Sequence, residues 1–262
     1  MRKRCTLIST SMLLLSACGQ SVPPNNATSC FNPELYQAGN QYLTVIMEDG
    51  KPKAPTLVKL TKDDTQPYPA GKESRLMHVA MASISTVLTN RVFSIDAANY
   101  RYALLSEDYQ IDTFTTKMRA DKHTASIIDF NFDTPNQSHS RDVSYDIEYI
   151  NADDATANQT TTQHSKATTT FVGIESITTP AGEFDTCRIQ TTLTDAEGKH
   201  GQETTTWYAQ QLGIPVKITS TIDERAPMET VLIQATINGK TFTPTPADIT
   251  KLQLADALAF AK

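Results

Sequence analysis

Between residues 171 and 237 the sequence repeats one unit, a short run of alternating apolar and polar residues that ends in a tight-turn signal. Alternation with period two places every second side chain on one face, so each run predicts a half-buried β-strand. The turn signals at 180–182, 195–201 and 238–240 contain Pro, Gly, Asp or Asn. Short turns favour antiparallel pairing, because parallel neighbours need a long crossover. The sequence therefore predicts a mainly β (α+β) fold built on a curved antiparallel sheet or half-barrel meander.

Runs of the same kind extend this pattern toward the N-terminus. They lie at 42–47, 56–60, 100–105, 112–118, 127–133 and 143–149. Asp49-Gly50, between the first two runs, is a hairpin signal because both residues tolerate the positive φ of a tight turn. Residues 151–168 are polar, which predicts either a long mobile connection or an exposed edge strand with a loop. We expect a single antiparallel β domain over residues 30–262.

Two helices are expected to accompany the sheet. Apolar or small residues recur every three or four positions from Leu76 to Leu88, which predicts an internal helix over about 75–91. The Ser and Thr residues between them also allow a strand. Near the C-terminus, Thr245-Pro246-Ala247-Asp248 has the form of a capping box with Pro at the first helical position. An apolar stripe follows it, so we expect a C-terminal helix that packs on the sheet.

The N-terminus has the three parts of an export signal. Basic residues occupy positions 2–4, a short apolar stretch ends at Leu15, and the motif Leu15-Ser16-Ala17-Cys18 follows. The stretch is too short to cross a bilayer as a helix, which takes about 20 apolar residues. The motif resembles the lipobox of bacterial lipoproteins. The resemblance implies that residues 1–17 are removed as a signal peptide and that Cys18 is lipidated; the alternative is a plain signal with an incidental cysteine.

A diacylglyceryl group at Cys18 would attach the protein to a membrane, because two acyl chains suffice for stable anchoring. The residue after it is Gly19 rather than Asp. In lipoproteins of this kind that choice implies sorting to the outer membrane, where the protein would face the periplasm. Residues 18–29 are then expected to be the lipidated flexible tether, since they contain polar residues and a Pro pair.

Two cysteines remain once Cys5 is removed with the signal and Cys18 is lipidated. Cys30 and Cys187 would lie in an oxidising compartment, where a leftover pair favours a disulfide. The bond would clamp the start of the domain onto a late strand. The alternative is a pair of buried or unpaired thiols.

The segment from Phe171 to Cys187 and the later Trp207-Tyr208-Ala209 with Gly213-Ile214-Pro215-Val216-Lys217 resemble a family of uncharacterised bacterial envelope lipoproteins. The resemblance implies a curved β domain exported to the envelope, and it supplies no catalytic residues. Pro180 and Gly182 also have a plain structural explanation, because they shape a turn. A looser, fold-level analogy connects this design to the periplasmic lipoprotein carriers, which hold acyl chains between sheet and helices.

Motifs for catalysis, cofactors or metals are not apparent. The five histidines have no zinc-type spacing, and neither a phosphate loop nor a serine-hydrolase motif occurs. Asp129, Asn131 and Asp133 could share a strand face and bind Ca²⁺, but a solvated strand face explains them more simply. The formal net charge of −6 argues against nucleic acid as a partner. We therefore assign no catalytic, cofactor-binding or metal residues.

The sequence points to a non-enzymatic role in envelope assembly. Either the sheet closes around a cavity for an apolar ligand, covered by the 76–88 stripe, or it packs solid and binds an envelope protein on its surface. A cavity would favour the first, and an exposed apolar patch the second. The remaining alternative is a hydrolase whose catalytic residues come from distant strands.

Overall fold

Strands of the described residues form one antiparallel sheet. The computed structural model describes residues 25–37, 39–62, 75–83, 87–120, 123–195, 197–222 and 226–260. Twelve strands in these ranges form the ring: β1 (Gln41–Glu48), β2 (Lys51–Lys62), β3 (Arg75–Ser83), β4 (Leu88–Asp96), β5 (Arg101–Ile111), β6 (Phe114–Arg119), β8 (Gln137–Asn151), β9 (Gln159–Thr179), β10 (Gly182–Asp195), β11 (His200–Ala209), β12 (Pro215–Ile222) and β13 (Met228–Ile237). Two short strands lie off the ring: β7 (Ser126–Asp129) pairs with β5, and β14 (Lys240–Phe242) pairs with β13.

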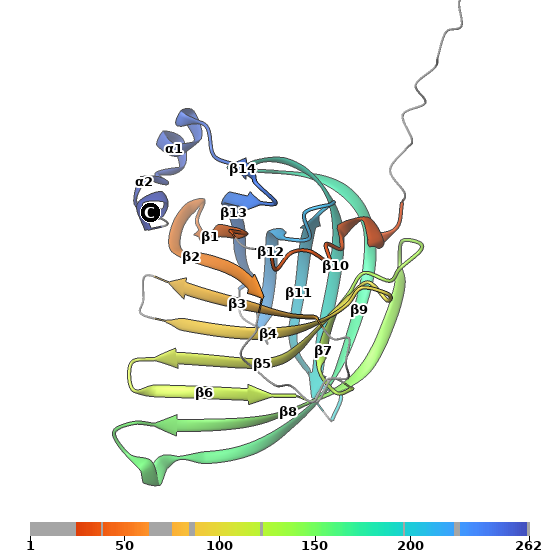
Figure 1. Ribbon diagram of the computed structural model, residues 1–262, viewed down its shortest axis with the longest axis vertical. Coiled ribbons are helices and arrows are strands. Elements are labelled where there is room, and N and C mark those ends of the chain that lie inside the picture. Colours follow the sequence, from red (N-terminus) through yellow and green to blue (C-terminus); the bar gives the residue numbers. More distant parts are fainter. Residues whose placement is uncertain are drawn as a thin grey trace, which may run out of the picture.

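The pairing of β13 with β1 closes the sheet into a barrel. Strands β2–β6 and β8 form one wall and β9–β13 the other, and the two walls run across each other (Figure 1). Closure removes the unpaired edges that an open sheet would expose. The predicted mainly β, curved antiparallel fold class is confirmed. The sheet is a closed barrel rather than a half-barrel.

The internal helix predicted over 75–91 is wrong. Its residues form the β3–β4 hairpin, in which Met77 pairs with Phe93 and Val79 with Arg91. The side chains of Met77, Val79 and Met81 share one face of β3, so the apolar residues also fit period two. Pairing of β3 with β2 and β4 decides between the two periods, and β-branched and Ser residues favour the strand. Residues 71–74 and 84–86, including Ser74, lie outside the described residues.

The C-terminal helix begins where the sequence predicts but is divided in two. Its parts are α1 (Pro246–Leu252) and α2 (Ala255–Phe260). Thr245 caps α1, because its Oγ1 accepts the Asp248 N–H at 3.2 Å. Gln253 has a left-handed backbone that ends α1 and turns Leu254 into an apolar cluster on the outer face of β1 and β13. No helix in the described ranges is long and apolar enough to cross a membrane.

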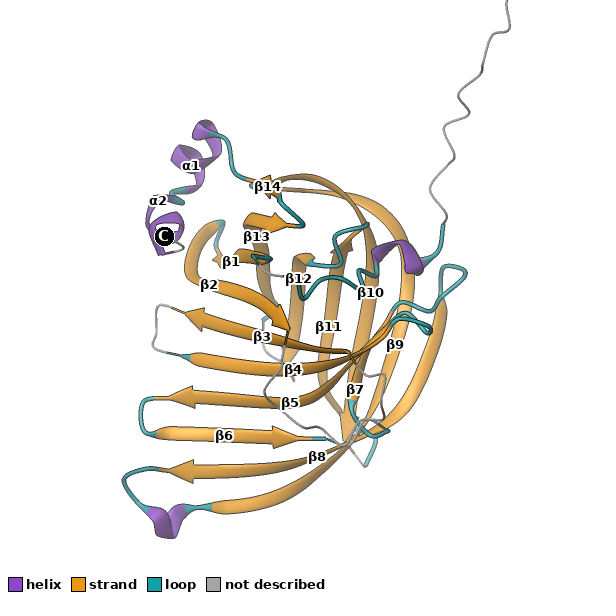
Figure 2. Cartoon of the chain, viewed as in Figure 1, coloured by secondary structure: helices purple, strands orange, loops and turns teal. Residues whose placement is uncertain are grey.

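The N-terminal segment packs into the barrel core. It contains the 3-10 helix η1 (Ala27–Cys30), whose Ala27 and Cys30 are fully buried. The Phe31 ring contacts Tyr102 and Phe130 at centroid distances of 4.8 and 6.1 Å. Residues 25–29, the end of the predicted tether, therefore belong to the folded part. Figure 2 shows this helix beside the strands of the barrel.

Two further segments depart from the sequence expectation. The predicted strand over 127–133 ends at Asp129, whose side chain accepts the Asn131 backbone N–H at 2.9 Å in a local turn, while Phe130 and Phe132 are buried in the core. Of the polar stretch 151–168, the first part contains the 3-10 helix η2 (Ala155–Ala157). The rest begins β9 with mostly exposed side chains, as in the exposed-strand alternative, but residues 165–168 pair with both β8 and β10 and are not an edge.

Candidate functional site

A cavity of about 280 Å³ lies inside the barrel. Its lining comes from β1–β5, β7, β11, β12 and β13 and from the N-terminal segment. Most of these side chains are apolar, and Val58, Val79 and Phe93 among them are buried in the main core. The residues of β3 that suggested a helical stripe supply part of this wall, as a strand. The cavity is thus bounded by the sheet itself and not by a helical cover.

One charged residue, Arg91, interrupts the mostly apolar lining. Arg91 enters the cavity from β4 and lies directly opposite Glu107 of β5. Its Nε and Nη2 donate to the two Glu107 carboxylate oxygens at 3.0 and 3.1 Å. This two-pronged geometry is the strong form of an arginine–carboxylate contact. The contact offsets the charge of Arg91, which remains a strongly polar group in a mostly apolar wall.

Two tyrosines lie near this pair. Tyr42 of β1 is partly exposed, and it lines the cavity with Tyr208 of β11. Burial raises the pKa of Tyr42 to about 12, and the positive charge of Arg91 opposes that rise. Burial, and then the neighbouring Tyr42, raise the pKa of Tyr208 as well. Both hydroxyls therefore stay protonated at neutral pH and can donate and accept hydrogen bonds.

The N-terminal segment is fastened beside the cavity by a polar network. The Tyr102 hydroxyl donates to the Asn32 carbonyl at 2.5 Å and accepts the Asn32 N–H at 3.1 Å. The Asn32 amide donates to the Leu212 carbonyl at 3.1 Å. Gly213 follows with φ +72°, and a Cβ there would come within 2.7 Å of the Asn32 Cβ. Only glycine allows the turn after β11 to approach this closely.

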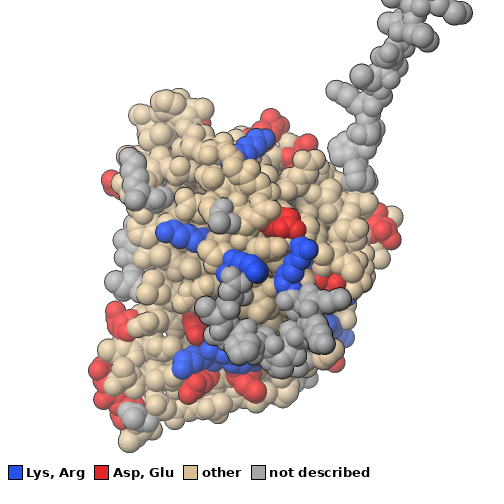
Figure 3. Space-filling model, viewed as in Figure 1, with Lys and Arg blue, Asp and Glu red and all other residues tan. Residues whose placement is uncertain are grey.

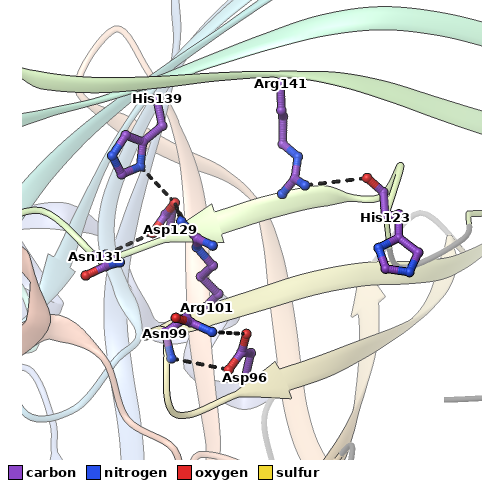
Figure 4. Close-up of polar contacts among 8 residues, drawn as sticks. All are labelled: Asp96, Asn99, Arg101, His123, Asp129, Asn131, His139 and Arg141. Atoms are coloured by element: carbon purple, nitrogen blue, oxygen red, sulfur yellow. Dashed lines mark hydrogen bonds and ion pairs between the residues drawn. The ribbon is translucent and has the colours of Figure 1, made fainter. Parts of the chain in front are cut away.

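A second concave region lies where β7 takes the place of β6 next to β5. In the part of the chain that the structure describes, β7 forms a ladder with β5 alone, and side chains connect it to β8. The buried Asp129 carboxylate accepts from Arg101 Nε and Nη2 at 3.0 Å each, and His139 Nδ1 lies 3.1 Å from it (Figure 4). We call this region the β7–β8 seam.

The seam does not form the calcium site considered from the sequence. Asp129 is paired with Arg101, and it also accepts the Asn131 backbone N–H at 2.9 Å. The Asp133 N–H instead bonds the Gln137 side chain at 3.0 Å. Among the described residues, no group of three or more His, Cys, Asp or Glu side chains is arranged to hold a metal ion.

The seam does contain a carboxylate–imidazole pair, which a hydrolase would need. The neighbouring Ser138 and Ser140 belong to the other face of β8. Their hydroxyls bond Thr170 and Thr168 at 2.8 and 2.9 Å. Within the described ranges no serine hydroxyl contacts His139, whose ring stacks on Phe132.

A family model described as DUF3108-like matches residues 77–220, more than half of the 262-residue chain. The protein belongs to the DUF3108-like family. The matched segment runs from β3 into β12, and it includes the motif residues between 171 and 217. The family resemblance drawn from those residues is confirmed.

Three solved structures show similarity to this DUF3108-like protein. A candidate lipoprotein from Parabacteroides distasonis shares 12% identity, with 81% of this chain and 97% of that chain covered and a TM-score of 0.43. A candidate exported protein with a YmcC-like fold from Bacteroides fragilis shares 14%, with 80% and 98% covered and a TM-score of 0.42. The hypothetical lipoprotein YmcC from Escherichia coli shares 11%, with 71% and 89% covered and a TM-score of 0.33. A search of curated proteins found no match.

Two aromatic residues of the motif, Trp207 and Phe184, belong to the main hydrophobic core of the DUF3108-like domain. Trp207 is buried beneath two cations, because Arg188 and Lys217 each lie 5.5 Å from its ring centroid. Its indole N–H donates to Glu175. Phe184, after the Pro180–Gly182 turn, is buried against Phe242. These contacts hold strands together, in agreement with the structural explanation of the motif.

The structure describes two of the three cysteines to which the sequence analysis assigned a role. Cys18, with the signal and most of the tether, lies outside the described residues, so its lipidation stays a prediction. In the structure Cys30 and Cys187 are joined by a disulfide that ties the N-terminal segment to β10. Sequence reasoning missed Arg91, Glu107 and Tyr42. Had residues 88–96 been assigned to a strand, period two would have placed the charged Arg91 on the same inward face as Phe93. That placement is the signal that could have identified it.

Proposed function

We propose that this protein binds an amphiphile inside the barrel, as a lipid-anchored protein of the bacterial envelope. The ligand class is an apolar chain that carries one polar group. The observation that supports it is the mostly apolar cavity of about 280 Å³ with Tyr42 and Arg91, which pairs with Glu107, in its wall. Its volume is near the lower end of small-molecule pockets, roughly 300–1,000 Å³, so it suits a short chain or part of a longer one.

The placement of polar groups supports an amphiphile rather than a pure hydrocarbon. A ligand that filled the apolar part would gain about 25 cal/mol for each Å² of apolar surface removed from water. Its polar group would need hydrogen bonds to offset the loss of water. Arg91, Tyr42 and Tyr208 offer donors and acceptors for that purpose.

Docking of an envelope protein on the outer surface is the competing proposal. Large exposed apolar side chains of the described residues include Leu88, Phe114 and Met228, each at the first position of its strand. On the face shown in Figure 3, basic and acidic residues are interspersed. Neither observation favours a broad docking face, so the cavity has the stronger support.

The proposed anchor is a diacylglyceryl group on Cys18, with cleavage after Ala17 and placement at the outer membrane facing the periplasm. The support is the Leu15-Ser16-Ala17-Cys18 motif behind a basic start, with Gly19 after it. Attachment near a bilayer would place the cavity next to a source of amphiphiles. The two parts of the proposal are separable, because anchoring and ligand binding can be measured independently.

Native mass spectrometry of the purified full chain, with solvent extraction of the same sample, tests the cavity. We expect an amphiphile to co-purify with the wild type. Val79→Phe and Ile218→Phe should each reduce its occupancy at least fivefold, because their side chains would fill the cavity. Ala80→Phe is the matched control on the opposite face of β3 and should retain the ligand. Undiminished ligand in both cavity variants would show that it binds elsewhere.

A further inference from the structure

We propose that the β7–β8 seam holds a second binding site, which takes a phosphate group between Arg101 and Arg141. The site is a depression of about 440 Å³ lined by these two residues, Asp129, His139 and neighbouring side chains. It is distinct from the barrel cavity. On β5 and β7, Tyr102 and Ile128 face the cavity, whereas Arg101 and Asp129 alternate with them and face the seam.

The seam carries more positive than negative charge. Asp129 is its one carboxylate among the lining residues, and it is already engaged by Arg101 and His139. In Figure 4, His139 and Arg141 project from one strand toward the strand that carries Asp129. Two guanidinium groups therefore share a single acidic partner. This local excess stands out because the whole chain has a formal net charge of −6.

Arg141 has hydrogen-bonding capacity to spare. Its Nη2 donates to the His123 carbonyl at 3.5 Å, the outer limit for such a bond. Its Nε is buried, and no acceptor among the described residues reaches it. A buried donor without an acceptor loses its hydrogen bonds to water and gains none in return, which destabilises the folded state. Burial and the nearby Arg101 also lower the pKa of Arg141, so the surroundings disfavour its charge.

A bound anion would relieve both costs. A phosphate oxygen can accept from a guanidinium N–H, and the charge of the phosphate offsets the repulsion between the two arginines. Inorganic phosphate and the head group of a phospholipid both present such oxygens. The alternative is a purely structural network in which Arg101, Asp129 and His139 join β7 to β8 and Arg141 covers them.

Isothermal titration calorimetry on the detergent-purified full chain tests the proposal with two probes, inorganic phosphate and glycerophosphoglycerol. We expect saturable binding of at least one. Tighter binding of the diester would assign the site to a lipid head group, and tighter binding of inorganic phosphate would assign it to the free anion. The absence of saturable heat with either probe would overturn the proposal.

Arg141→Gln should weaken binding at least tenfold. Arg141→Lys should weaken it to a smaller extent, because it keeps the charge but loses the planar pair of donors. Arg119→Gln is the control for charge, since Arg119 forms an exposed ion pair with Asp108 elsewhere on the barrel. Equal losses in Arg119→Gln and Arg141→Gln would contradict a built site. Circular dichroism checks that each variant is folded, and the cavity proposal is unaffected by either result.

Discussion

The indole N–H of Trp207 donates a hydrogen bond of 2.5 Å to the Glu175 carboxylate, across 32 residues of sequence. Glu175 lies on β9 and Trp207 on β11, and the strand between them contributes Arg188, which pairs directly with Trp207. The contact therefore spans three adjacent strands. It gives the glutamate and the tryptophan of the motif a shared structural role.

Removing this hydrogen bond should destabilise the barrel. Glu175→Gln and Trp207→Phe should each lower the free energy of unfolding by about 1–2 kcal/mol, because a bond to a charged group is lost at a partly exposed site. Urea unfolding measures the change. In the double variant the two losses should not add, and full additivity would show that the residues do not interact.

The disulfide should contribute strongly to stability. Cys30 and Cys187 enclose 157 residues of sequence separation, and the chain-entropy model gives about 4–5 kcal/mol for a loop of that size. Reduction, or the Cys30→Ser variant, should shift urea unfolding accordingly. Thiol labelling of the denatured, unreduced mature protein should find both cysteines blocked. Labelling at either position would show that the bond does not form in cells.

Stability should decrease at high pH through Tyr42. Its pKa is about 12 in the folded protein against 10.0 as the ordinary value, so the folded state disfavours ionisation. The stabilising effect is complete below pH 10 and is lost as the pH rises from 10 through 12, by at most about 3 kcal/mol. Tyr42→Phe should flatten this part of the stability profile. Thr44→Ala, another change in the cavity wall, should leave the slope as in the wild type.

Gly213 and Gly50 provide a matched pair of glycines, because both have a φ of +72°. A Cβ at Gly50 would meet nothing within 4 Å, whereas one at Gly213 would lie 2.7 Å from Asn32 Cβ. Gly50→Ala should cost about 1–2 kcal/mol for its backbone conformation alone. Gly213→Ala should cost about 1–3 kcal/mol more through overpacking. Thermal unfolding measures both, and equal costs would rule out the close contact.

Lipidation predicts where the protein is found after cell fractionation. Wild-type protein should sediment with membranes and incorporate labelled palmitate. Cys18→Ala should incorporate none, because it lacks the thiol that accepts the diacylglyceryl group. An intact N-terminal methionine on the abundant wild-type form would contradict the anchor.

The strands that sequence analysis predicted well are those with one buried face. In 143–149, Val143 and Ile147 are buried, while Asp146 and Glu148 are exposed, so alternation alone suffices. The residues of β3 fit two periods, and pairing partners from β2 and β4 decide between them. Such partners are distant in sequence and leave no local signal.

For the same reason, the sequence could not decide whether the sheet closes around a cavity or packs solid. Closure depends on β1 pairing with β13, which joins the two ends of the domain, as in the contact of Tyr42 with Ala235. The pairing of Arg91 with Glu107 can be recognised only once the register of β4 against β5 is known. The disulfide was accessible because cysteine counting needs no register.

The burial of η1 limits how far the barrel can travel from its anchor. If Cys18 carries the lipid, residues 19–24 alone separate it from the described fold. A fully extended chain spans at most about 3.6 Å per residue, so that end of the barrel stays within about 25 Å of the leaflet. Such a short tether would confine exchange of the proposed ligand to one bilayer. Delivery to a facing membrane would require another protein.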